Sequence, residues 1–207
     1  MYTQPLIEGE YFHIFNRGVN GEDIFKEQRN YYYFLQQYMA YCSDVLETFA
    51  YALLKNHFHL LVYVKENVQV AKHKGQGMVQ LNASRQLSHF FNSYAQAINN
   101  ANKRTGPLFE SPFERKLIED DSYLTSMIYY CHYNAQLHEF VKNFKEWEFS
   151  SYDPVLENNN SFLDSIEDKN HSQTLDNIKP VVKDFFVPRF RIKINLKKTT
   201  LKIIIVF

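Results

Sequence analysis

Residues 45–64 read VLETFAYALLKNHFHLLVYV, and this stretch indicates the fold more strongly than any other part of the chain. Two apolar runs, residues 45–54 and 57–64, are separated only by Lys55 and Asn56. Runs of this length that are rich in β-branched and aromatic residues are typical of strands, and so short a connection favours antiparallel pairing. The stretch therefore predicts a β-hairpin.

Further elements are expected on both sides of this hairpin, from hydrophobic spacing and turn signals. They are a strand at residues 11–16 ending at Asn16-Arg17-Gly18, a helix at 30–41, a polar loop at 69–78, a helix at 84–103, a strand at 116–119 and, after the N-cap signal Asp121-Ser122, a helix to about residue 134. This order predicts an α+β fold, a ferredoxin-like split β-α-β arrangement in which an antiparallel sheet carries helices on one face.

The composition is that of a globular protein with a balanced charge. The 207 residues include 23 basic and 23 acidic residues, and 16% are aromatic. This balance argues mildly against a protein that coats long duplex DNA, but not against an enzyme that grips a short strand. Two cysteines, no signal-peptide pattern and no long apolar run lead us to expect a soluble cytoplasmic protein that does not bind membranes.

We expect residues 1–152 to form one domain, because all of these patterns lie within them. Asn158-Asn159-Asn160 marks a linker, and residues 161–179 are acidic and polar. Residues 189–207 carry six basic and no acidic residues and end in LKIIIVF. A strand, a docking segment and a disordered arm all fit this end, so residues 153–207 are expected to be a linker and tail of unassigned role.

His57 and His59 lie two residues apart in the second strand of the hairpin. Alternate side chains of a strand share a face, so both imidazoles would point to one side and Phe58 to the other. Two imidazoles about 7 Å apart can converge on one metal ion. The plainer alternative is a pair of half-exposed histidines that bind water or backbone. His13, in the first strand, fits either a neighbour of this site or a surface residue.

The helix expected after residue 121 contains YYCHYN at 129–134. Tyr130 and Asn134 share a helix face, His132 points nearly opposite, and Tyr129 is expected to pack inside. A phenol beside an amide suits a nucleophile next to a third metal ligand. Alternatively, Tyr130 belongs to the apolar side of an ordinary amphipathic helix.

Taken together, these features resemble the HUH-type single-tyrosine transposases, and most closely their REP-associated branch. Six pieces match in order across about residues 11–152. They are HIFNRG at 13–18, FAYALLKNHFHLLV at 49–62, FFNSY at 90–94, GPLFESPFER at 106–115, YYCHYN at 129–134 and WEFSSY at 147–152. The resemblance implies a bacterial, cytoplasmic enzyme that cleaves and rejoins single-stranded DNA through a 5′-phosphotyrosine.

The resemblance also assigns roles to residues. Tyr130 would be the nucleophile, because the family's tyrosine precedes its third polar ligand by four residues. His57, His59 and Asn134 would bind a divalent metal, Mg²⁺ or Mn²⁺. The DNA would be single-stranded or folded into a hairpin, and members of the family act as monomers or homodimers. The basic residues expected to contact DNA are Arg17, Lys103, Arg104, Arg115 and Lys116.

Three positions depart from the family pattern. Lys55 stands where proline is frequent, Glu110 where glutamine is common, and Ala135 where proline commonly follows the third ligand. A carboxylate at position 110, close to a phosphate path, would weaken DNA affinity.

Two other functions fit parts of the pattern. An antiparallel sheet with exposed aromatic residues is the platform of RNA-recognition domains, and such a module would bind nucleic acid without metal or covalent adduct. A metal-dependent phosphodiesterase would use the same histidines with water as the nucleophile, and its turnover would survive the loss of Tyr130.

Overall fold

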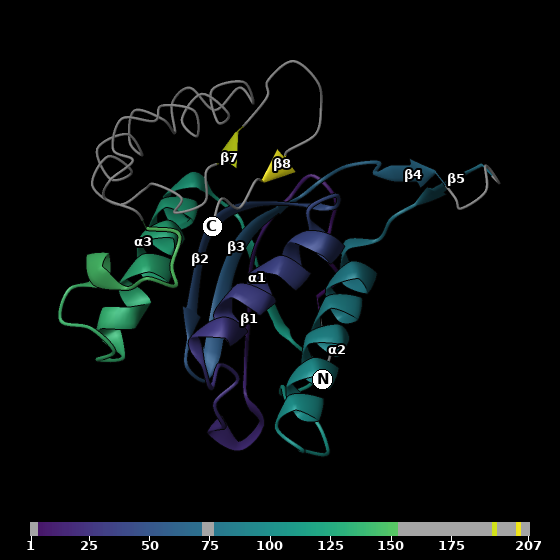
Figure 1. Cartoon of the computed structure of the whole chain (residues 1–207). Helices are drawn as coiled ribbons and strands as arrows, with labels where there is room; N and C mark the ends of the chain where they lie inside the picture. The colour runs from purple at the N-terminus through teal and green to yellow at the C-terminus, as the bar shows by residue number, and fades with distance from the viewer. Residues whose placement is uncertain (1–3, 72–76, 153–191, 194–201, 204–207) are drawn as a thin grey trace. The chain divides into compact units, whose positions relative to one another are not determined.

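The hairpin expected at residues 45–64 belongs to a four-stranded sheet (Figure 1). The computed structural model describes residues 4–71, 77–152, 192–193 and 202–203. The strands of the sheet are β1 (Tyr11–Arg17), β2 (Leu46–Leu54), β3 (His57–Val64) and β6 (Glu114–Ile118), in the order β2-β3-β1-β6. Helix α1 (Gln28–Cys42) connects β1 to β2, α2 (Ala83–Ala101) lies between β3 and β6, and α3 (Asp121–Leu137) follows β6. This order is the ferredoxin-like one, so the predicted α+β fold is confirmed.

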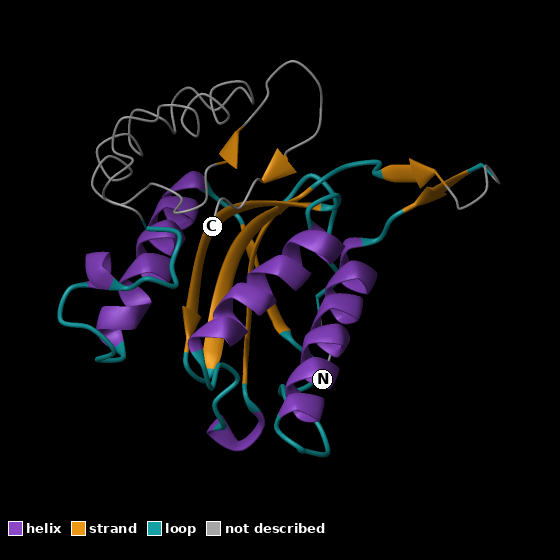
Figure 2. Ribbon diagram, viewed as in Figure 1, coloured by secondary structure: helices purple, strands orange, loops and turns teal. Residues whose placement is uncertain are grey.

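The pairing of β1 with β3 divides the side chains of these strands between two faces. The strands are antiparallel, with Phe15 opposite His59 and Asn16 opposite Phe58. One face carries the fully buried apolar residues Phe12, Ile14, Phe58, Leu60 and Val62, with the buried amide of Asn16 at its end. Helices α1 and α2 cover this face, as Figure 2 shows, and the Phe58 ring lies 5.0 Å from that of Phe34 on α1 and 5.5 Å from that of Phe91 on α2. The histidines of β3 point to the other face.

An aromatic cluster centred on Phe34 joins the helices. Its ring meets those of Phe25, Phe90 and Tyr94 edge to face, at centroid distances of 5.1, 4.8 and 5.0 Å. Such pairs contribute about 0.5–1.5 kcal/mol each beyond the burial of their area. The buried hydroxyl of Tyr94 donates to the carbonyl of Ile24 at 2.9 Å, so its polar group is satisfied. Much of the unusual aromatic content therefore serves the core.

The predicted turn at Asn16-Arg17-Gly18 ends β1 and contacts the hairpin turn. Gly18 N–H donates to the carbonyl of Asn56 at 2.8 Å, and the N–H groups of Ile24 and Phe25 both donate to the carbonyl of Lys55 at 2.9 Å. A Cβ atom at position 18 would lie 1.9 Å from the carbonyl oxygen of Glu22. Only glycine therefore fits where these two turns meet.

The segment predicted as a loop at residues 69–78 differs from expectation. Its two ends form strands, β4 (Gln69–Ala71) and β5 (Met78–Gln80), which pair antiparallel with Val70 opposite Val79. The residues between them, 72–76, lie outside the described part of the chain. The loop prediction is wrong for the paired residues, because a cross-strand valine pair stabilises a ribbon even among polar neighbours.

The other helices and strands begin or end within a few residues of the boundaries predicted from the sequence. Strand β6 begins at Glu114, two residues before the expected start, and α3 continues to Leu137. The N-cap of α3 is Asp120, whose carboxylate accepts from Tyr123 N–H at 2.8 Å. Within the described ranges, none of the helices has the length and apolar content that crossing a bilayer requires.

The chain divides into two compact units, Met1–Phe49 with Leu53–Leu117 and Ala50–Ala52 with Ile118–Phe207. The division falls inside the domain expected at residues 1–152. The second unit contains α3 and the 3₁₀ turn η3 (Phe144–Glu146), and in it Ser150 bridges to Ala52. The described part of the tail is two paired strands, β7 (Ile192–Lys193) and β8 (Lys202–Ile203). The expected linker at 158–160 and the acidic stretch at 161–179 lie outside the described residues.

Candidate active site

The two histidines of the predicted metal pair begin β3, directly after the hairpin turn. His57 is partly exposed, whereas His59 is buried. Their ring centroids are 5.3 Å apart and their planes are nearly perpendicular, at 86°. Alternation along the strand places both on the face opposite Phe58.

His13 of β1 belongs to the same group. Its Nε2 atom lies 2.9 Å from Nδ1 of His59, and the two rings stack with centroids 5.1 Å apart. Burial, and secondarily the charge of Lys116, lowers the pKa of His13 to about 4, so this imidazole is neutral near pH 7. Of the two alternatives left open by the sequence, the neighbour of the site is confirmed. Because alternate side chains of a strand share a face, the spacing of His13, Phe15 and Arg17 in the sequence already indicates that these three residues point to the same side.

The hydrogen bonds of these rings fit a metal ion bound through Nε2 of His57 and His59. His57 Nδ1 lies 2.7 Å from Asn56 Oδ1, and because a carbonyl oxygen only accepts, Nδ1 is the donor. A neutral His13 can likewise accept the Nδ1–H of His59. Engagement of the remote ring nitrogen in this way is usual for metal-binding histidines.

In the part of the chain that the structure describes, the acidic and sulfur ligands that often complete such a site do not join the pair. Among the residues that the structure describes, no three His, Cys, Asp or Glu side chains gather to hold a metal ion. The third ligand expected from the resemblance, the amide of Asn134, is of another type and lies in the second compact unit.

Tyr130 and Asn134 share one face of α3, four residues apart, with Asn134 fully buried and Tyr130 partly exposed. Tyr129 does not pack inside as predicted, because 38% of its surface is exposed. The buried side of α3 runs along Leu124, Ile128 and Cys131, and Tyr129 lies outside that arc. Its ring stacks on that of Tyr133 instead, with centroids 5.2 Å apart.

His132 has a structural environment. It is fully buried, its Nε2 lies 2.6 Å from Ser151 Oγ, and burial lowers its pKa to about 3. The Ser151 hydroxyl also accepts from the backbone N–H of Tyr51 at 2.9 Å. The sequence predicted only that His132 points away from Tyr130, since a histidine and a serine nineteen positions apart carry no pairing signal.

All five basic residues expected to contact DNA are exposed or partly exposed, and the partly exposed ones are Arg104 and Arg115. Arg17 is paired with Glu110, Nε to Oε1 at 2.8 Å, and this bond raises its pKa. The guanidinium of Arg115 lies 4.2 Å from the ring centre of Phe113, and burial lowers its pKa. Lys103 and Lys116 are exposed.

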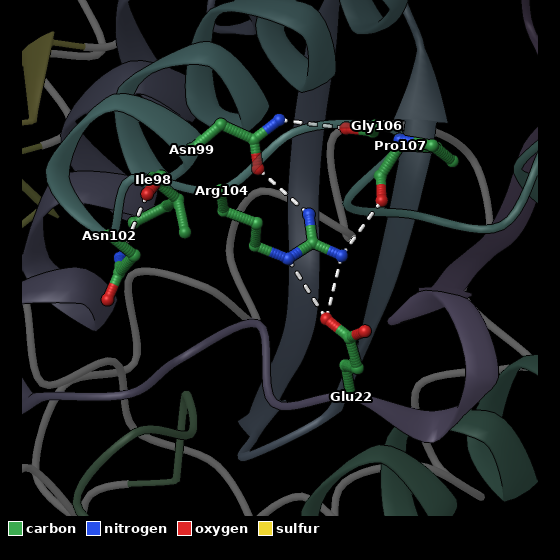
Figure 3. Close-up of polar contacts among 7 residues, drawn as sticks. All are labelled: Glu22, Ile98, Asn99, Asn102, Arg104, Gly106 and Pro107. Atoms are coloured by element: carbon green, nitrogen blue, oxygen red, sulfur yellow. Dashed lines mark hydrogen bonds and ion pairs between the residues drawn. The ribbon is translucent and has the colours of Figure 1, made fainter.

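Arg104 is held by hydrogen bonds to several neighbouring groups, as Figure 3 shows. Its guanidinium bonds Glu22 Oε2 at 2.7 and 2.9 Å, Asn99 Oδ1 at 2.8 Å and the carbonyl of Pro107 at 3.0 Å. Only 14% of the side chain is exposed. This environment favours a structural role that fixes the chain after α2.

Comparison with known proteins supports the same family as the sequence motifs. No family model matches the chain. A Haemophilus influenzae protein named as a REP-associated tyrosine transposase is 31% identical over 125 residues, which cover 58% of this chain and 66% of the relative's length. The chain belongs to the REP-associated tyrosine transposase family. A solved structure of such a transposase bound to a REP hairpin is similar in fold, with a TM-score of 0.56, 14% identity, and coverage of 73% of this chain and 81% of that one.

The three positions that depart from the REP-associated transposase pattern, Lys55, Glu110 and Ala135, each make different contacts. Lys55 pairs with Asp23 at 3.2 Å, while its carbonyl receives the bonds that join the two turns. Glu110 pairs with Arg17, so its charge is opposed by a neighbouring cation. Ala135 is fully buried on α3, two residues before the helix ends at Leu137.

Proposed function

We propose that this chain is a transposase or endonuclease that cleaves and rejoins single-stranded DNA next to a hairpin. Tyr130 is the nucleophile, and His57, His59 and Asn134 bind a divalent metal, Mg²⁺ or Mn²⁺. The main support is the same-face histidine pair, whose Nδ1 atoms are both hydrogen-bonded, on a sheet with the ferredoxin-like strand order. The named relative and the hairpin-bound structure of similar fold support a DNA substrate.

The reaction requires one exchange of bonds at phosphorus. Tyr130 Oη attacks a phosphodiester, so that the Oη–P bond forms while the P–O3′ bond breaks. The phenol gives its proton to solvent or a base, and the departing oxygen gains one, which leaves a 3′-OH and a 5′-phosphotyrosine. A metal bound at the site would act as a Lewis acid on the phosphate. The tyrosyl ester conserves the phosphodiester energy, so another 3′-OH can attack it and rejoin strands without ATP.

His13 and Asn56 hold the two imidazoles in this proposal. Each bonds the ring nitrogen remote from the expected metal, at 2.9 Å from His59 and 2.7 Å from His57. Loss of such a partner typically lowers metal affinity by about 10–100-fold. Neither residue would touch the DNA for this purpose, so both act by positioning.

The nucleophile is tested by Tyr130→Phe, with Tyr129→Phe as the matched control one residue earlier on α3. Removal of the Tyr130 hydroxyl should leave folding and DNA binding intact but abolish both cleavage and the protein–DNA adduct that survives denaturant. The control should keep both. An adduct formed by Tyr130→Phe would assign the nucleophile to Tyr129 or Tyr133.

The metal assignment is tested by His57→Ala and His59→Ala, with the exposed His138→Ala as control. Mn²⁺ binding measured by calorimetry and cleavage of a hairpin-bearing strand should both be lost in the first two variants and kept in the third. Normal cleavage by either of the first two would show the metal assignment to be wrong. Cleavage by the unaltered protein without an adduct would favour the phosphodiesterase, and binding without cleavage would favour the nucleic-acid-binding module.

A further inference from the structure

One long segment of the chain contains no acidic residue. Residues 67–109, bounded by Glu66 and Glu110, hold none of the 23 acidic residues but five of the 23 basic ones. At the chain's average of one acidic residue in nine, a segment of 43 residues would contain about five. The segment comprises the β4–β5 hairpin and α2, so the bias belongs to two structural elements that adjoin in the chain.

The exposed side of α2 is a row of hydrogen-bond donors, which we call the α2 stripe. It consists of Arg85, His89, Asn92, Gln96 and Asn100, all exposed and spaced by three or four residues. The opposite side of α2 is buried in the core. The stripe is about 22 Å long at 1.5 Å per residue, and Lys103 follows it.

Two cations lie at the ends of this surface, Arg85 on the stripe and Lys103 after it. In the described part of the chain, neither Arg85 nor Lys103 forms an ion pair, and Arg85 Nε donates to His89 at 3.4 Å. Arg115 of β6 donates to Ser84 at 3.3 Å, which places another guanidinium beside the start of the stripe. On α1, by contrast, Arg29 is paired with Glu27.

We propose that the α2 stripe binds the sugar–phosphate backbone of the duplex stem of a DNA hairpin, an inference that rests on the proposed function. Guanidinium, imidazole and amide groups all donate to phosphate oxygens, and a row of them without a carboxylate is complementary to a polyanion. Single-strand sites combine basic groups with exposed aromatic rings for base stacking. The stripe contains no phenylalanine, tyrosine or tryptophan, so it suits the backbone of a stem rather than unpaired bases.

The test compares two double variants with the same change in charge. Arg85→Glu with Gln96→Glu alters the stripe, and Arg29→Glu with Gln36→Glu alters exposed residues of α1. A glutamate at position 85 lies in the first turn of α2, where a negative charge is favourable for the helix. Thermal unfolding monitored by circular dichroism should confirm that both variants remain folded.

Binding is measured by fluorescence anisotropy with a labelled DNA hairpin and with an unstructured strand of equal length. We expect the stripe variant to lose at least about tenfold in affinity for the hairpin and much less for the unstructured strand. The slope of log affinity against log salt concentration should become shallower by about the contribution of one phosphate contact. The α1 variant should change hairpin affinity much less.

Equal weakening by the two variants would overturn the proposal, because net charge alone would then explain the loss. Equal losses on hairpin and unstructured strand would overturn the assignment to the stem. If the unaltered protein cleaves DNA but the stripe variant binds the hairpin normally, only this surface assignment fails. If the unaltered protein neither binds DNA nor forms an adduct, the proposed function fails, and this inference fails with it.

Discussion

Acidification should destabilise the protein through His132, which is fully buried on α3. Its Nε2 lies 2.6 Å from the Ser151 hydroxyl, and burial lowers its pKa from 6.5 to about 3. In the unfolded chain the same imidazole titrates near its ordinary pKa of about 6.5. Below that pH the unfolded state therefore binds a proton that the folded state does not, and stability falls as pH falls towards 3.

The size of the effect follows from the two pKa values. The free energy of unfolding loses at most about 1.4 kcal/mol for each pH unit between them. From pH 7.0 to 5.5, His132 should contribute a loss of about 1.3 kcal/mol. His13, whose pKa is lowered to about 4, adds a loss in the same direction. The contribution of His132 must therefore be isolated by substitution.

The assay is urea unfolding at pH 7.0 and 5.5 for the unaltered protein, His132→Gln and His138→Gln. Glutamine does not titrate, and its terminal amide can reach the Ser151 hydroxyl. His132→Gln should lose about 1.3 kcal/mol less on acidification than the unaltered protein. His138 is exposed, so His138→Gln should lose as much as the unaltered protein. If His132→Gln and the unaltered protein lost equal stability, the proton uptake would belong to other groups.

Two further predictions concern the packing that holds the turns. Gly18→Ala should lower the free energy of unfolding by more than about 3 kcal/mol, because its Cβ would lie 1.9 Å from the carbonyl oxygen of Glu22. Gly21→Ala is the control, since open space surrounds that position and only its φ of +75° is strained, which should cost about 1–2 kcal/mol. Arg104→Ala should cost about 2–3 kcal/mol in urea unfolding by removing its charged hydrogen bonds, while hairpin affinity changes little. A stable Arg104→Ala variant with weakened DNA binding would instead restore Arg104 to the DNA-contacting residues.

The sequence predicted those features that depend on local spacing. The hairpin at 45–64, the shared face of His57 and His59, and the shared face of Tyr130 and Asn134 all follow from strand and helix periodicity. The order of elements then led to the ferredoxin-like sheet, since few topologies accommodate it.

Long-range pairing was beyond such reasoning. Nothing in the sequence pairs His13 with His59, 46 positions away, or Arg17 with Glu110. The prediction for Tyr129 was wrong because the rotation of about 100° between consecutive helix residues shows only that Tyr129 and Tyr130 point in different directions. Which of the two faces solvent depends on how α3 packs. The β4–β5 ribbon was missed because one valine pair among polar residues is a weak period-two signal.

The register between β1 and β3 connects the tight turn at Gly18 to the chemistry of the histidines. Side chains alternate with a period of two, so a slip of one residue would exchange the faces of a strand. Phe58 would then lie among the histidines, and His57 and His59 would face the aromatic core under α1 and α2. The bond from Gly18 N–H to the carbonyl of Asn56 lies one residue beyond the pairing of Arg17 with His57, at the end of the ladder. The absence of a side chain at position 18 lets the turn after β1 close onto Glu22, and the bond to Asn56 extends the ladder in the register that keeps both imidazoles on the same side as His13.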